Sequence, residues 1–466
     1  MNAAPPPGSR RLIELARYHE VTKHSIASVR SSPHYLDWGN KPLPFKVYTS
    51  LEAITAPDDV ARLCLLGNGV LRWRRSGAGE VYGFRAAPCT GALYHTELYL
   101  ATADRDGLAA GLYHYGAHDR GLRRLREGDV RQSVAEAAGG FPALAEAPLV
   151  LILTSTFWRN AWKYRARAYR HAYWDGGAVL ANLLGLAAAE DSTSAVVMGF
   201  DDGAVNRLLG VDGEREAATA VLALGGGSKA PAPPGRGMEA LELETESLSP
   251  RPVRYPEIEE AHRASTLTSG TAAAVWRDPA EAAPPGVPPR LVPDAEGAIR
   301  ARRSTRRFGP GAISLRALER LLAVAEATVP GDSFVPGLIT PFLIVNAVDG
   351  LRPGIYGPGL APIRAGDFRR QAAALALGQA LGGEAAANVY FLCDLDAAGA
   401  LFGERGYRVV QTASGIAGAR VELSATAQGL GATGLTFFDD EVTRFVGPAA
   451  AGREVMYLVA VGAPPG

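Results

Sequence analysis

Cysteine, net charge and long apolar runs are all scarce in this sequence. The three cysteines, Cys64, Cys89 and Cys393, are too few and too scattered for a disulfide framework or a cysteine-based zinc site. Neither His-Glu-x-x-His nor Cys-x-x-Cys occurs, so no metal is expected. Such a chain suits a reducing compartment, and we expect it in the cytoplasm.

The balance of charge excludes two classes of partner. Lysine plus arginine and aspartate plus glutamate number 48 each, which leaves no long-range field to attract nucleic acid or an anionic membrane. The longest apolar runs, PLVLILT from Pro148 and AVLANLLGLAAA from Ala178, are shorter than the roughly 20 residues that span a bilayer. The first residues, MNAAPPPGSRR, interleave proline and charge where a secretory signal would be apolar. We expect no nucleic acid and no membrane as partners.

An internal repeat is the strongest signal that is present. Tyr169 and Gly177 recur at one constant spacing as Tyr407 and Gly415. Both pairs lie in long, proline-free segments rich in small residues, which predict two helices packed closely against a large partner. Short runs of valine, isoleucine and leucine precede each segment and predict buried strands. The chain therefore contains two copies of one α+β domain.

A stretch dense in proline and glycine separates the copies (KAPAPPGRG, EAAPPGVPP). We interpret it as a linker without continuous helix or sheet. The predicted organisation is an N-terminal extension (1–50), a first domain (51–227), the linker (228–293) and a second domain (294–466). Because a linker raises the effective concentration of one copy for the other, we expect an intramolecular pseudo-dimer, which could form a further homodimer.

A basic segment of the second copy precedes the helix predicted from Leu315 behind the N-cap Ser314. A solvated, charged face is the simpler interpretation of this segment. Arginine forks beside a serine hydroxyl also form a phosphate grip, because a guanidinium binds phosphate bidentately and stays charged. The residues that would form it are Arg302, Arg303, Ser304 and Arg306.

The first copy carries a turn and a Lys-Tyr pair instead. Residues 85–94 (RAAPCTGALY) precede a predicted strand, and their proline and glycine let the backbone approach a flat ring closely. Lys163-Tyr164 places a possible base beside a phenol, although the solvated start of a basic helix explains the pair equally well. The second copy has a different turn, GDSFVPGLITP, and Leu401-Phe402 in the register of the pair.

These complementary losses predict one composite ligand site between the copies, where pockets commonly lie. The sequence GLGATG (429–434) matches the dinucleotide-binding G-x-G-x-x-G pattern, but a predicted helix precedes it and the apolar run LTFF follows. A dinucleotide fingerprint needs a strand before it and a helix after it. We interpret these glycines as a helix stop and a turn into a strand.

Together these segments resemble the FMN-dependent nitroreductase superfamily, and within it the tandem SagB-type (SagB/ThcOx) dehydrogenases. The resemblance covers most of the chain. RRSTRRF (302–308) looks like the superfamily's R-R-S-x-R-x-F segment, which holds the FMN phosphate, and residues 85–94 look like its R-x-x-P-S-A-G-A-L-Y turn, which covers the flavin from the partner subunit. The implied fold is α+β: two tandem nitroreductase-like domains, each with a mixed, mainly antiparallel sheet flanked by helices, in a pseudo-dimer.

The resemblance also implies the roles of individual residues. Lys163-Tyr164 is similar to the catalytic pair of SagB-type azoline dehydrogenases, with the lysine as base and the tyrosine as an orienting hydroxyl. Two departures from the family pattern are Cys89-Thr90 in place of Ser-Ala and Thr436-Phe437 in place of a Gly before the Phe. One FMN per chain is expected, bound by Arg302, Arg303, Ser304, Arg306, Pro88, Cys89, Thr90, Gly91, Thr436 and Phe437.

The activity that the resemblance implies is FMN-dependent oxidation of a thiazoline or oxazoline in a peptide, by hydride transfer to flavin N5. Two alternatives stay open: an NAD(P)H-dependent nitroreductase or flavin reductase, and a non-catalytic flavin-binding scaffold in a peptide-modifying complex. The expected partners are a small-molecule or modified-peptide substrate and other peptide-modifying enzymes.

Overall fold

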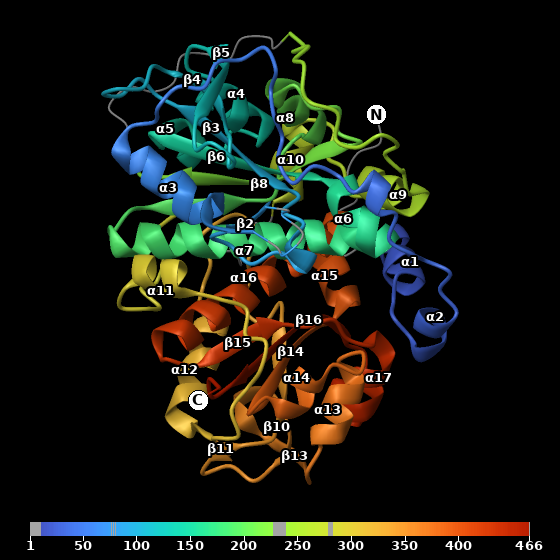
Figure 1. Ribbon diagram of the computed structural model, residues 1–466. Coiled ribbons are helices and arrows are strands. Elements are labelled where there is room, and N and C mark those ends of the chain that lie inside the picture. The colour runs from blue at the N-terminus through green and yellow to red at the C-terminus, as the bar shows by residue number, and fades with distance from the viewer. Residues whose placement is uncertain are drawn as a thin grey trace.

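Two domains lie against each other across two long helices in the middle of the molecule, α7 (Ala168–Ala189) and α16 (Gly406–Ala427) (Figure 1). They are the two helices and the two copies that the repeat predicts. None of the helices that the structure describes combines the length and the apolar character that a membrane crossing requires. The computed structural model describes residues 11–75, 77, 79, 81–226, 239–277 and 283–465.

Each domain is built on a sheet of six strands. The bounds are β3 (Thr96–Thr102), β4 (Gly111–Tyr115), β5 (Leu122–Glu127), β6 (Leu149–Thr156), β7 (Ser194–Val197) and β8 (Glu216–Leu224) in the first domain, and β10 (Thr340–Val345), β12 (Gly354–Tyr356), β13 (Pro362–Ala365), β14 (Ala387–Cys393), β15 (Gly431–Gly434) and β16 (Glu454–Gly462) in the second. The orders β5-β4-β3-β6-β8-β7 and β13-β12-β10-β14-β16-β15 are equivalent, and all these neighbours pair antiparallel. Isolated parallel bridges, Val196–Gly331 and Ser304–Ala432, make each sheet mixed, as predicted.

Helices surround both sheets, and two short ribbons complete the domains. The first domain has α3 (Asp58–Asn68), α4 (Arg131–Ala137), α5 (Pro142–Glu146), α6 (Phe157–Tyr164), α8 (Asp202–Leu209) and the ribbon of β1 (Val70–Arg75) and β2 (Val81–Arg85). The second has α11 (Ala295–Ala301), α12 (Leu315–Glu326), α13 (Arg369–Leu375), α14 (Ala380–Glu384), α15 (Leu395–Phe402), α17 (Asp439–Val446) and the ribbon of β9 (Ile313–Ser314) and β11 (Val348–Asp349). Ser314 caps α12 as predicted, because its Oγ accepts the Ala317 N–H at 3.1 Å.

Glycine brings the two central helices into backbone contact. A Cβ on Gly177 would lie 2.6 Å from the Thr412 carbonyl oxygen, and one on Gly415 would collide with the Trp174 carbonyl. These two glycines are the pair that the repeat aligns. Nearly every residue of both helices is buried, which explains why their sequences are rich in small residues and show no polar face.

Two buried ion-pair clusters lock the domains together, and each joins a carboxylate of one domain to two arginines of the other. Asp202 accepts Arg405 Nη1 at 2.6 Å and Arg408 Nη1 at 2.5 Å. Asp439 accepts Arg167 Nη1 and Arg170 Nη1 in the same way, at 2.8 and 2.7 Å. Although burial opposes ionisation, the arginines lower the pKa of Asp202 to about 2, and they also lower that of Asp439.

The N-terminal extension packs on the second domain through α1 (Glu14–Val21), which is followed by α2 (Ile26–Arg30) (Figure 1). The Glu404 carboxylate accepts the N–H groups of Ile13, Glu14 and Leu15 at 2.8, 2.9 and 3.0 Å, so a residue of the second domain caps this helix.

Two sequence-based expectations are wrong. The predicted linker contains two helices, α9 (Pro256–Ala264) and α10 (Gly270–Trp276), because its only proline between 256 and 276 stands at the first helical position, where proline is tolerated. KAPAPPGRG (229–237) lies outside the described residues. The prediction for GLGATG is wrong only in its second half: Gly429, with a φ of +71°, follows the end of α16 in a turn as predicted, but Gly431 and Gly434 form strand β15, paired with β16, and LTFF (435–438) is not a strand.

Candidate functional site

The basic segment of the second domain meets the turn of the first. Arg302 follows α11, and its side chain is only 5% exposed. Its Nη2 donates to the Ala86 carbonyl, beside the turn, at 3.3 Å, and its Nη1 pairs with Glu422 Oε2 at 3.2 Å. Its Nε is buried and has no hydrogen-bond partner among the described residues. The structure thus brings together the basic segment and the turn, which the sequence assigns to one site.

The other members of the basic segment have different surroundings. Arg303 Nη1 donates to the carbonyls of Arg300, Ala301 and Arg302 at 2.7 to 2.8 Å, so Arg303 caps the C-terminal end of α11. Ser304 is half-buried and bridges to β15, and Arg306 is exposed. Arg302 is therefore the buried cation of this segment.

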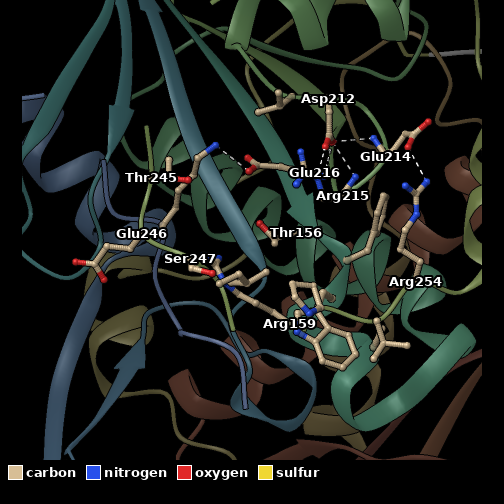
Figure 2. A pocket seen from close by; sticks show the side chains of 18 of the residues that line it. Thr156, Arg159, Asp212, Glu214, Arg215, Glu216, Thr245, Glu246, Ser247 and Arg254 are labelled. Atoms are coloured by element: carbon tan, nitrogen blue, oxygen red, sulfur yellow. Dashed lines mark hydrogen bonds and ion pairs between the residues drawn. The ribbon is translucent and has the colours of Figure 1, made fainter. Parts of the chain in front are cut away.

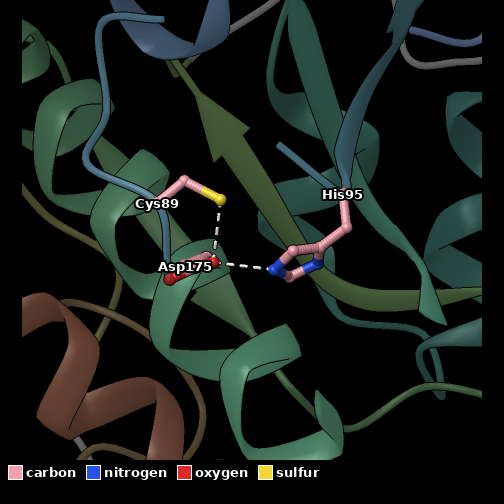
Figure 3. A group of neighbouring side chains, drawn as sticks. All are labelled: Cys89, His95 and Asp175. Carbon is pink, nitrogen blue, oxygen red and sulfur yellow. Dashed lines mark hydrogen bonds and ion pairs between the residues drawn. The ribbon is translucent and has the colours of Figure 1, made fainter. Parts of the chain in front are cut away.

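The turn itself, a short 3-10 helix (Thr90–Ala92), is anchored on α7 by Asp175 (Figure 3). The Asp175 Oδ2 accepts from Cys89 Sγ at 3.0 Å and from the Thr90 N–H at 2.9 Å, and His95 Nε2 lies 2.7 Å from it. Thr90 Oγ1 donates to the other carboxylate oxygen at 2.8 Å. Burial and the Asp175 charge raise the pKa of the Cys89 thiol.

Cys89, His95 and Asp175 are also the one group of three metal-type ligands that the described part of the chain brings together. The four groups around Asp175 already occupy its oxygens, so the cluster is a hydrogen-bond hub for the turn. Neither His95 nor Asp175 is among the site residues predicted from the sequence. A signal for Asp175 exists, because it is the one carboxylate in the helix sequence AYRHAYWDGGAVLANLLGLAAA.

The Lys-Tyr pair lies in the last turn of α6, so the alternative interpretation of the pair as a helix start is wrong. A Cβ on Gly91, whose φ is +66°, would lie 2.8 Å from the Tyr164 hydroxyl. Tyr164 therefore lies directly against the turn, where only glycine fits. Its ring meets His171 edge-on at 4.7 Å, and burial raises its pKa. Lys163 is exposed, with its Nζ 5.3 Å from the centre of the Tyr164 ring.

The predicted cofactor-binding residues Thr436 and Phe437 are less accessible than the turn. Phe437 is fully buried, with Trp174 at 6.2 Å between ring centres and the Arg167 guanidinium 5.3 Å above its ring. Thr436 is half-buried, and its carbonyl accepts from Gln379 Nε2 at 3.5 Å. The Phe437 side chain thus belongs to the core of the second domain, so its contribution to a ligand site is limited to its backbone.

The pseudo-equivalent position in the first domain, Gly199, is covered. The Asp332 carboxylate accepts the Met198 and Gly199 N–H groups at 2.8 and 2.9 Å. The indole of Trp276, at the end of α10, lies so close to Gly199 that a Cβ there would be 2.6 Å from Cε3. The Trp276 Nε1 donates to the Phe402 carbonyl at 2.7 Å. A linker side chain and a turn of the second domain therefore fill this end of the interface.

A separate cavity of about 1010 Å³ lies in the first domain, between the beginning of α6, the loop before β8 and the segments around residues 45–48 and 243–259 (Figure 2). Ion pairs line its walls, among them Arg254 with Glu214 at 2.6 Å and Lys46 with Glu216 at 2.8 Å. None of the predicted site residues contributes to it.

Comparison with known proteins agrees with this architecture. The family model described as "Nitroreductase family" matches residues 56–226 and 299–463, one match in each domain, and the chain belongs to that family. Membership supports an oxidoreductase, and proteins of this family generally bind FMN. The predicted pair of nitroreductase-like domains is thereby confirmed.

Two proteins illustrate the likeness. The crystal structure of a nitroreductase-like protein from Anabaena variabilis is 31% identical, covers 97% of this chain and 100% of that chain, and has a TM-score of 0.81. A nitroreductase-like protein of Methanocaldococcus jannaschii is 28% identical over 133 residues, which are 28% of this chain and 67% of the relative.

Proposed function

We propose that this chain is an FMN-dependent dehydrogenase of the SagB type, which oxidises a thiazoline or oxazoline in a peptide to the azole. One observation carries the proposal. Two segments, each present in only one of the two copies, meet at the same turn. Tyr164 lies against Gly91 of that turn, and Arg302 of the other domain donates to Ala86 at its base.

The residues at this convergence suit a flavin phosphate. Arg302 offers a buried Nε without a partner in the described structure, and Ser304 and Arg306 add a hydroxyl and a second guanidinium in the next four positions. Glycine at position 91 leaves room for the Tyr164 hydroxyl, so the backbone of the turn and the phenol can contact the same ligand. When bound, FMN supplies the hydride acceptor for the reaction.

The remaining chemistry falls to Lys163 and Tyr164. Forming an azole removes a proton from the ring carbon next to the peptide carbonyl as well as a hydride. Lys163 Nζ, exposed at the end of α6, accepts that proton in its neutral form. The Tyr164 hydroxyl, which stays protonated because burial raises its pKa, orients the substrate by hydrogen bonding.

Single-turnover reduction of the bound flavin by a supplied azoline peptide tests this proposal. Lys163→Ala should slow reduction by about a hundredfold or more while the flavin stays bound, and Tyr164→Phe should slow it less. Arg165→Ala removes a neighbouring exposed positive charge and should change little.

Two results would contradict the proposal. If Lys163→Ala reduced its flavin as fast as the parent, the pair would be no more than a charged helix end. If NADPH bleached the flavin rapidly and the azoline peptide did not, the chain would be an NAD(P)H-dependent flavin reductase of the same family.

A further inference from the structure

A buried carboxylate faces the cation that the proposed phosphate site depends on. Glu422 lies on α16 and is only 2% exposed, and its Oε2 is 3.2 Å from Arg302 Nη1. Its Oε1 accepts the Gly434 N–H of β15 at 3.2 Å. In the register that aligns Gly177 with Gly415, α7 has Leu184 at this position. The carboxylate is therefore specific to the half of the protein that carries the arginine segment.

Two segments place charged or titratable groups around Glu422. Arg302 and Arg306 of the segment after α11 favour its ionised form, and Tyr457 of β16 is an un-ionised phenol within electrostatic reach. Burial outweighs both arginines and raises the pKa of Glu422. In the ionised state the carboxylate neutralises Arg302, so the guanidinium is not free to balance a second anion.

We propose that Glu422 makes binding of a phosphorylated flavin depend on proton uptake, and that it thereby sets how strongly the site prefers FMN to riboflavin. The phosphate and the carboxylate compete for the charge of Arg302. When the phosphate binds, Glu422 takes one proton from solvent, and Arg302 then balances the phosphate alone. This proposal rests on the assignment of FMN to the site.

The direction of the pH effect follows from this exchange. Below the pKa of Glu422 in the free protein, the carboxyl is already protonated and FMN binds without proton uptake. Above it, each pH unit weakens FMN binding by up to tenfold, because a proton must be acquired. A phosphate monoester loses its second proton near pH 6, so its own titration is complete in the alkaline part of the range. Riboflavin has no phosphate and should show no such dependence.

The experiment measures the Kd of apoprotein for FMN and for riboflavin between pH 6.5 and 9.0, from quenching of flavin fluorescence. For the parent, the Kd for FMN should rise with pH while that for riboflavin stays constant. Glu422→Gln should abolish the rise and bind FMN at least tenfold more tightly at pH 9. Calorimetric titration in buffers of different ionisation enthalpy should detect up to one proton taken up per FMN by the parent and none by the variant.

Glu326→Gln provides the matched control, because Glu326 is a largely exposed residue of α12, and partial desolvation of its carboxyl raises its pKa without any charged partner. The Glu326→Gln variant should keep the parent's dependence of the FMN Kd on pH. An equal pH dependence in Glu422→Gln, a dependence shared by riboflavin, or no proton uptake by the parent would each overturn the proposal. If the protein bound neither flavin, the cofactor assignment itself would fall and this proposal with it, whereas flavin binding without the linkage would overturn this proposal alone.

Discussion

The two ends of the interface between the domains lie at corresponding places of the repeat but have different contents. At one end, the turn at Cys89 is held by Asp175 and stands beside Arg302 of the other domain. At the other end, the turn of the second domain inserts Asp332 against the amides of Met198 and Gly199. Trp276 then covers Gly199.

The difference shows what becomes possible when two subunits are joined in one chain. A symmetric homodimer has two identical sites, and every substitution changes both. Here the glycine that precedes phenylalanine is kept in the first domain, at Gly199, where it is covered by an indole. The second domain has Phe437 in that register, and it is the half with the arginine segment. One end is thereby filled as part of the core, and the other is the end to which the proposed FMN site is assigned.

The largest effect should come from breaking the ion-pair clusters that both ends share. Asp202→Ala leaves Arg405 and Arg408 buried without a counterion, and Asp439→Ala does the same to Arg167 and Arg170. Each should lower the free energy of unfolding in guanidinium chloride by about 3–5 kcal/mol. Similar losses would show that the two clusters contribute equally to stability, although the two ends of the interface differ.

Asp440→Ala is the control for this prediction, because Asp440 is exposed and pairs with Lys23 at 2.9 Å. Its loss should be under about 1 kcal/mol. A small effect for either buried aspartate would mean that its cluster does not hold the domains together.

The second effect concerns the filled end. Trp276→Ala removes a side chain that is 4% exposed and should cost about 3 kcal/mol. Added indole should recover part of the loss by binding in the space beside Gly199 and Phe402. The flavin content, measured by absorbance after gel filtration, should stay at one FMN per chain, because the first domain has no arginine segment.

Trp73→Ala, at a tryptophan that is 47% exposed, should cost much less and should not respond to indole. Two flavins per chain in the Trp276 variant would break the comparison. That result would mean that the indole, rather than the missing arginines, limits the protein to one site.

The third effect is a loss of stability in acid. Because the folded protein lowers the pKa of Asp202 to about 2, below the usual 3.8, this group stabilises the fold at every pH above about 4. The stabilisation, about 2 kcal/mol, should disappear as the pH falls from about 4 to about 2. Unfolding curves measured between pH 2 and 6 should show this loss for the parent and a smaller one for Asp202→Asn. If the free energy of unfolding fell equally with pH in both proteins, Asp202 would not be the cause of the loss in acid.

The smallest effect should come from Cys89→Ser. A serine hydroxyl can donate to Asp175 and accept the Tyr94 N–H, as the Cys89 sulfur does at 3.0 Å in both cases. The free energy of unfolding should change by less than about 1 kcal/mol. Because the pKa of this thiol is raised, the native parent should also react slowly with a disulfide reagent at pH 8. If the Cys89 thiol reacted as fast in the native protein as in the unfolded protein, its hydrogen bonds to Asp175 and Tyr94 would not protect it.

Much of the fold could be predicted because its signals are local or repeated. Constant spacing between copies identified α7 and α16, and the helix cap at Ser314 is a property of a few adjacent residues. The helices of the linker were missed because its prolines were counted over the whole stretch, although α9 tolerates Pro256 at its first position. The β15 glycines were read as a turn because pairing with β16 depends on residues far away in the sequence.

The candidate site was predictable only in part, for a related reason. Arg302 and residues 85–94 carry recognisable patterns, and the structure brings them together. Asp175, Glu422 and Trp276 have their roles only through contacts with other segments, and no pattern of neighbouring residues reports such contacts. Asp175 and Glu422 are each the one carboxylate of their helix, and Trp276 is the one aromatic residue of α10, which is the trace that the sequence alone contains.

The close approach of α7 and α16 has a consequence for how this protein can change over generations. In a symmetric dimer, a glycine beside the two-fold axis meets its own copy, so a single codon change adds two methyl groups to the same crowded contact. In this chain Gly177 and Gly415 are separate codons, each facing the other helix's backbone. A methyl group on one helix can therefore be accommodated before any appears on the other, so the contact can become asymmetric by single, separately tolerated steps.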